Sequence, residues 1–171
     1  MGRHTGITDL QLTSRGEQNA RDLGRRLTGI SFDAVYSSPM QRATTTAHLA
    51  GFDHPQLTDL LKEVDYGRYE GLTTAEIHES HPDWEIYKDG SPGGETPAQI
   101  YARANEFIAF ARRRPGGRVL AFGHGHMLRA IAAAWIQADL KIAARLQLDV
   151  ATLNILLDAD RGRAIALWNA S

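Results

Sequence analysis

The sequence predicts one domain of the three-layer α/β/α class, built around a mostly parallel sheet. A length of 171 residues is enough for a single domain with a proper core. Short apolar segments alternate along the chain with amphipathic helical patterns. The clearest junction follows the apolar run 118–122, which ends in Gly123-His124-Gly125-His126 before a helical pattern at 127–136. This order is typical of a buried strand, a tight turn and a helix in an open α/β sheet.

The first half of the chain alternates helices and strands after a loop at 1–12 that has no periodicity. Residues 14–27 form a helical pattern, with Ser14 and Glu17 as a possible capping box. Ser38-Pro39 is typical of a helix start, so a second helix is expected to run to residue 50. The remaining elements expected here are strands at 32–36 and 57–61 and a glycine- and tyrosine-rich loop at 63–71.

The second half repeats the alternation and ends in a hairpin. Short helices are expected at 74–80 and 82–88, followed by a turn-rich loop at 89–95. Residues 97–113 place apolar side chains on one helical face. Two apolar segments, at 151–157 and 163–168, flank a turn around Asp158–Gly162 and predict a pair of strands.

The composition favours a small-molecule protein of a reducing compartment. Hydrophobic residues make up 43% and charged residues 23% of the chain, which is ordinary for a globular protein. A net charge of −1 predicts neither a nucleic-acid nor a membrane partner. The chain has no cysteine, and no apolar run reaches the roughly 18–20 residues of a membrane span. We therefore expect a cytoplasmic protein without a signal peptide, and the sequence predicts no oligomeric state.

His124 is the first candidate site residue, because ligands bind at the carboxyl ends of parallel strands. The backbone N–H groups of the following helix start offer a place for a phosphate. Arg42, one turn into the helix after Ser38-Pro39, could hold a phosphate oxygen or could be a solvated surface arginine. Glu63, in an aromatic-rich loop, could be a general acid or base or an ordinary loop acid.

Two further groups complete the candidates. The segment Gly2-Arg3-His4-Thr5-Gly6 could grip an anion with Arg3, His4 and Thr5, or could be a frayed terminus. His124 and His126 have a His-x-His spacing without a third ligand, so no metal and no cofactor is expected.

In order along the chain, five motifs resemble the histidine phosphatase superfamily, in its phosphoglycerate mutase-like branch. The Arg-His-Thr-Gly and His-Gly-His variants are most similar to its acid phosphatases and sugar bisphosphatases. The motifs are Gly2–Asp9, Ser37–Ala43, Glu63–Gly71, Gly94-Glu95-Thr96 and His124–Arg129.

The resemblance implies phosphoryl transfer through a phosphohistidine without a metal. His124 would line the phosphate pocket, Arg42 would bind the phosphate, and Glu63 would protonate the leaving oxygen and then activate water. Further expected contacts to substrate come from Arg3, His4, Thr5, Gly6, Tyr66, Gly125 and His126. The expected activity is hydrolysis of small phosphate monoesters such as sugar phosphates, with phosphoglycerate mutase as the alternative.

The family places its nucleophilic histidine in an Arg-His-Gly motif at the end of an upstream first strand, and here only Met1 precedes Gly2. We therefore expect an N-terminally truncated chain with impaired activity, lacking that interior strand. A non-catalytic phospho-ligand binding protein is the second hypothesis, and His4 or His124 as a substitute nucleophile is the third. The missing strand also predicts a marginally stable chain, or a slot that a swapped strand or a partner fills.

Overall fold

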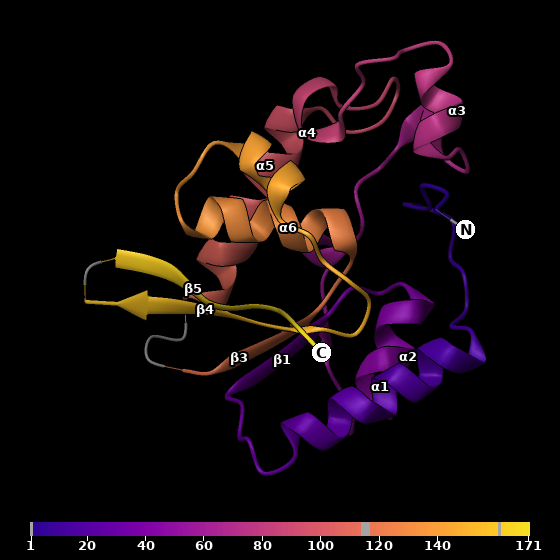
Figure 1. Cartoon of the computed structure of the whole chain (residues 1–171). Helices are drawn as coiled ribbons and strands as arrows, with labels where there is room; N and C mark the ends of the chain where they lie inside the picture. The colour runs from indigo at the N-terminus through magenta and orange to yellow at the C-terminus, as the bar shows by residue number, and fades with distance from the viewer. Residues whose placement is uncertain (1, 114–116, 161) are drawn as a thin grey trace.

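The computed structural model describes residues 2–113, 117–160 and 162–171. Met1 of the predicted loop and Arg161 of the predicted hairpin turn lie outside these ranges. Helices α1 (Ser14–Leu27) and α2 (Gln41–Leu49) cover one face of a parallel sheet, and α5 (Pro97–Ala111) and α6 (Gly125–Trp135) cover the other (Figure 1). The predicted three-layer α/β/α class is thereby confirmed.

The parallel sheet contains β1 (Ala34–Ser37), β2 (Gln56–Leu57) and β3 (Val119–Phe122), in the order β2-β1-β3. Tyr36 of β1 lies opposite Gln56 of β2 and Ala121 of β3. Side chains alternate across the sheet, so Ala34 and Tyr36 pack with α5 and α6, whereas Val35 packs with α1 and α2. The central strand therefore contributes to both cores.

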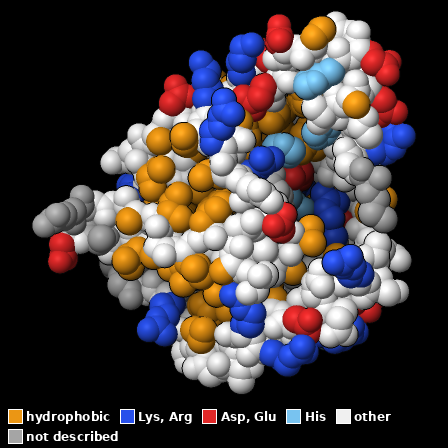
Figure 2. Space-filling model, viewed as in Figure 1, with side chains coloured by type: hydrophobic (Ala, Val, Ile, Leu, Met, Phe, Trp, Pro, Cys, Tyr) orange, Lys and Arg blue, Asp and Glu red, His pale blue; other side chains and the backbone are white. Residues whose placement is uncertain are grey.

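The predicted hairpin is confirmed as β4 (Leu153–Ala159) and β5 (Gly162–Ala170), which pair antiparallel in a second sheet. Within the described residues, β3 pairs only with β1 and β4 pairs only with β5. Ile155 and Leu157 of β4 are exposed, and hydrophobic side chains gather on both sides of the hairpin (Figure 2). Within the described residues, each sheet thus ends in a strand that pairs with no further strand on its outer edge.

Several predicted boundaries are wrong for local reasons. Thr13, not Ser14, caps α1, because its side chain accepts the N–H of Gly16 at 3.1 Å. Helix α2 begins at Gln41 after Met40, which makes no side-chain cap, so the predicted N-cap at Ser38 and helix start at Pro39 are two residues early. Helix α6 begins at Gly125, two residues before its predicted start, with His124 as its N-cap residue.

The shorter elements differ more from the predictions. The expected strand at 57–61 is the two-residue β2 followed by a 3-10 helix at Asp59–Leu61. Helix α3 (Thr74–His78) is confirmed in shortened form, whereas the helix expected at 82–88 is reduced to α4 (Ile86–Asp89). The 3-10 helices at Gly67–Tyr69 and Leu140–Arg145 were not predicted. No helix in the described part of the chain is long and apolar enough to cross a membrane.

Candidate active site

His124 lies at the carboxyl end of β3, as predicted, and only 8% of its surface is exposed. Its Nδ1 accepts a hydrogen bond from Arg42 Nε at 3.0 Å, so the ring proton is on Nε2. Nε2–H then donates to the buried Ser38 hydroxyl at 2.8 Å. Burial lowers the pKa of His124 to about 4. The nearby positive charges of Arg42 and Arg103 also lower this pKa, whereas the negative charge of Glu63 raises it. At neutral pH His124 is therefore an uncharged, oriented hydrogen-bond donor.

Arg42 is not a solvated surface arginine. Besides His124, its guanidinium donates to the carbonyl oxygens of Thr8 at 2.9 Å, Thr5 at 3.0 Å and Gly6 at 3.3 Å. Arg42, in the first turn of α2, thus connects the N-terminal loop to the imidazole of His124. Thr5 and Gly6 contribute to the site through their backbone carbonyl oxygens, which accept hydrogen bonds from Arg42.

The N-terminal segment is not frayed, because Glu70 holds it from the opposite side. The Glu70 carboxylate accepts the N–H of Gly6 at 2.9 Å and both the N–H and the hydroxyl of Thr8 at 2.9 and 2.7 Å. Burial opposes ionisation of Glu70, but these hydrogen bonds lower its pKa. A side chain on Gly6 would collide with the carbonyl oxygen of Val64, so only glycine fits there. The sequence indicated no such role for Glu70.

Arg3, which was predicted to contact substrate, bonds to other residues than Arg42 and Glu70 do. Its guanidinium donates to Gly71 O at 2.6 Å and pairs with Glu76 at 3.1 Å, with over half of its side chain exposed. Arg3 therefore anchors the loop to α3, and its placement among the anion-binding candidates is not supported by its contacts.

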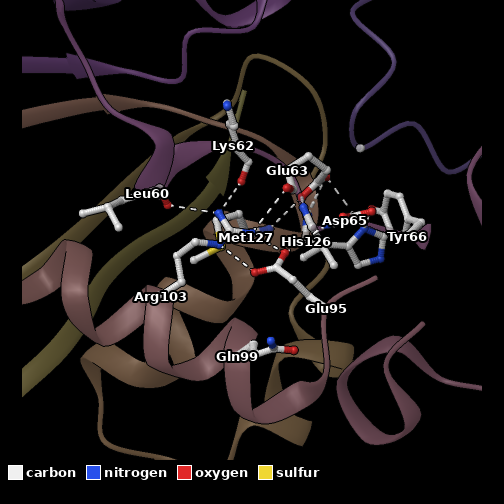
Figure 3. Close-up of polar contacts among 12 residues, drawn as sticks. Leu60, Lys62, Glu63, Asp65, Tyr66, Glu95, Gln99, Arg103, His126 and Met127 are labelled. Carbon is white, nitrogen blue, oxygen red and sulfur yellow. Dashed lines mark hydrogen bonds and ion pairs between the residues drawn. The ribbon is translucent and has the colours of Figure 1, made fainter. Parts of the chain in front are cut away.

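Glu63 is held at the N-terminus of α6, with 9% of its side chain exposed (Figure 3). Its carboxylate accepts the backbone N–H groups of Val64 at 3.0 Å, Met127 at 2.9 Å and His126 at 3.1 Å. Burial alone would raise the pKa of Glu63, but the hydrogen bonds from His126, and the charges of His126 and His124 in acid, where these rings are protonated, hold it far below its usual range.

Aromatic and imidazole rings form a wall beside Glu63. The Tyr66 hydroxyl lies 2.6 Å from His126 Nδ1, and burial raises the pKa of Tyr66, so the phenol stays protonated. The His4 ring lies 4.8 Å from Tyr66, 5.7 Å from His126 and 5.4 Å from Trp84. Burial and His126 lower the pKa of His4, so it too is neutral at pH 7. Trp84 was missed, because nothing in its local sequence distinguishes it from a core tryptophan.

The structure thus brings together nearly all predicted site residues at one edge of the parallel sheet. Figure 2 shows some of the histidine side chains at a hollow bordered by acidic and basic groups. Within the described ranges, no three His, Asp or Glu side chains lie close enough to hold a metal ion. Fixed N–H donors, a guanidinium and an ionised carboxylate are the groups that phosphoryl transfer uses.

Comparison with known proteins agrees with this chemistry. The chain matches the histidine phosphatase superfamily (branch 1) over residues 1–171. An acid phosphatase of Mycobacterium tuberculosis is 41% identical over 158 residues, covering 91% of this chain and 78% of that protein. A sedoheptulose 1,7-bisphosphatase of Saccharomyces cerevisiae is 32% identical over 166 residues, covering 78% of this chain and 61% of that protein.

The fold has an equally close counterpart among solved structures. The product of an open reading frame of Mycobacterium tuberculosis superposes with a TM-score of 0.95 at 38% identity, covering 99% of this chain and 90% of that one. Sequence, fold and site geometry point the same way: this chain belongs to branch 1 of the histidine phosphatase superfamily and is an enzyme of the phosphomonoesterase type.

Proposed function

We propose that this protein hydrolyses small-molecule phosphate monoesters, sugar phosphates or compounds like them, without a metal and in the cytoplasm. The observation that carries the proposal is the convergence of three groups at one sheet edge: His124, Arg42 bonded to it at 3.0 Å, and Glu63 at the start of α6. These groups offer a hydrogen-bond donor, a fixed cation and a proton-transfer group. Hydrolysis of a phosphate ester needs all three.

In the proposed reaction, the ester phosphoryl group lies against His124 and Arg42, which stabilise the charge that develops on its oxygens. The bond between phosphorus and the ester oxygen breaks, and Glu63 supplies the proton that the leaving oxygen takes up. Water forms the new bond to phosphorus as the bond to the ester oxygen breaks, and the proton that the water loses returns to Glu63, so inorganic phosphate and the alcohol are released. A bound phosphate dianion raises the pKa of Glu63 toward the value that proton donation requires.

The phosphoryl acceptor is the open part of the proposal. No Arg-His-Gly motif occurs within residues 1–171, where Arg3-His4 is followed by Thr5. We therefore propose that the 171-residue chain alone binds phosphate esters but turns them over slowly. A phosphohistidine on His4 or His124 is the alternative, and it would be detected by mass spectrometry under conditions that preserve the phosphoramidate.

The test is hydrolysis of p-nitrophenyl phosphate and glucose 6-phosphate by the folded chain, with His124→Ala as the matched variant. Turnover that His124→Ala removes supports the proposed hydrolase. If the wild-type chain shows no turnover but binds inorganic phosphate, and His124→Ala weakens that binding, the chain is a phospho-ligand binding protein. Transfer of phosphate between positions of phosphoglycerate, faster than its release to water, would overturn hydrolysis in favour of a mutase.

A further inference from the structure

Arg103 and Glu95 form an ion pair just behind Glu63 (Figure 3). Arg103 lies on α5, and Glu95 lies in the loop that precedes it. Arg103 Nε donates to Glu95 Oε1 at 2.8 Å and Nη2 donates to Oε2 at 2.6 Å, in a bidentate arrangement. The side chains are only 17% and 18% exposed.

The same guanidinium also holds the backbone that carries Glu63. Nη1 donates to the carbonyl oxygens of Leu60 at 3.2 Å and Lys62 at 2.7 Å, and Nη2 donates to that of Glu63 at 3.3 Å. Together with Glu95, these acceptors occupy each of the five N–H donors that an arginine has. A lysine offers three donors from a single atom and cannot reproduce this set.

Glu95 completes the attachment from the other side of Glu63. Its Oε2 accepts the N–H of Asp65 at 2.9 Å, so the pair fastens the chain both before and after Glu63. Residues 62–66 belong to no helix or strand, and Val64 is fully buried next to Glu63. Hydrogen bonds from the side chains of Arg103 and Glu95 therefore take the place of the regular backbone hydrogen bonds that residues 62–66 lack.

We propose that Arg103 and Glu95 are positioning residues that place the Glu63 carboxylate against the first N–H groups of α6. Their catalytic effect rests on the proposed phosphatase function, but their effect on Glu63 itself does not. The alternative is a purely structural ion pair, whose loss lowers stability and leaves the surroundings of Glu63 unchanged in the protein that remains folded.

The decisive measurement is the titration of the Glu63 carboxyl carbon by NMR in folded protein. The ionisable groups that face Glu63 are His126, His124, His4, Tyr66 and Tyr87, and none of them is altered in the variants. In wild type, Glu63 is expected to stay ionised down to the lowest pH at which the protein is folded. In Arg103→Lys and in Glu95→Gln, we expect its pKa to rise toward the ordinary value near 4.5.

The matched control is Arg112→Met, which removes an arginine at the end of the same helix, where it pairs with the exposed Asp158 at 3.1 Å. This control should leave the titration of Glu63 unchanged. Wild-type titration of Glu63 in folded Arg103→Lys and Glu95→Gln would overturn the proposal. If one variant fails to fold, the other decides.

Turnover provides the second arm. We expect kcat for glucose 6-phosphate to fall at least about tenfold in Arg103→Lys, with p-nitrophenyl phosphate less affected, because its leaving group needs less protonation. KM should change little, since Arg42 and His124 are untouched. Equal losses for both esters would contradict the positioning of Glu63. If wild type hydrolyses neither ester, the proposed function fails, while the NMR titration still decides the role of the pair.

Discussion

Glu63→Gln tests the central electrostatic feature of the site. The substitution keeps the size of the side chain but replaces one acceptor oxygen with an NH2 group and removes the charge. Three backbone N–H groups, from Val64, His126 and Met127, point at the carboxylate at 2.9–3.1 Å. In the variant, at least one of them faces a donor, and the others bond to a neutral oxygen.

The expected cost follows from those bonds. A hydrogen bond to a charged group contributes about 1.5–3 kcal/mol, and an unpaired buried donor costs a similar amount. We expect Glu63→Gln to lower the free energy of unfolding by about 3 kcal/mol at neutral pH, since the side chain is only 9% exposed. Glu106→Gln, at an exposed position on α5, should change it by less than about 0.5 kcal/mol.

The pH dependence gives the sign of the effect. Because the pKa of Glu63 is lowered in the folded protein, its stabilisation is present above the ordinary value near 4.5 and is lost as the pH falls below it. The difference between wild type and Glu63→Gln should therefore narrow by about 1 kcal/mol between neutral pH and about pH 4. Urea unfolding followed by tryptophan fluorescence measures both quantities. A difference below about 0.5 kcal/mol at neutral pH, or one that does not narrow in acid, would refute the reasoning.

Arg42→Ala should weaken the binding of inorganic phosphate at least about tenfold in calorimetry, and an unchanged affinity would remove Arg42 from the phosphate site. Because the pKa of His124 falls to about 4 on folding, the unfolded chain takes up this proton first as the pH drops below about 6.5. His124 therefore makes stability fall by about 3 kcal/mol from neutral pH to pH 4, and His124→Asn should flatten that part of the unfolding profile. Gly67→Ala should lower the melting temperature by at least about 8 °C, because Gly67 has φ +49° and a side chain there collides with Gly94 N; an unchanged melting temperature would contradict this packing.

The fold class was predictable because it depends on patterns that the sequence repeats. Apolar runs and amphipathic stretches mark α1, α5, β3 and the hairpin, and these elements are confirmed. Helix starts were predicted less well, because two neighbouring residues can be equally suitable as the N-cap residue. Thr13 caps α1 although Ser14 is an equally good candidate, and the difference lies in one hydrogen bond to Gly16. Between residues 58 and 73, short 3-10 turns and tertiary hydrogen bonds replace regular elements.

The site was predictable only where chemistry and position coincide. His124 follows a recognisable strand and Arg42 follows a recognisable helix start, so their meeting at one sheet edge could be expected. Glu70 and the Arg103–Glu95 pair could not be assigned roles in the same way. Their partners lie 62 residues away at Thr8 and up to 43 residues away at Leu60, and most of them are backbone groups that any residue type provides. No local residue pattern encodes such contacts.

The proposed reaction requires Glu63 in two protonation states, ionised as a base and protonated as an acid. In the free protein, the surroundings of Glu63 favour the ionised state. As a base toward water, Glu63 must be ionised, and the N–H groups at the start of α6 ensure this. As an acid toward the leaving oxygen, it must first hold a proton, which those same N–H groups oppose. A phosphate dianion bound against Arg42 and His124 supplies the missing influence, because its negative charge disfavours a second ionised group nearby. In the proposed reaction, protonation of Glu63 is thereby coupled to occupancy of the phosphate site.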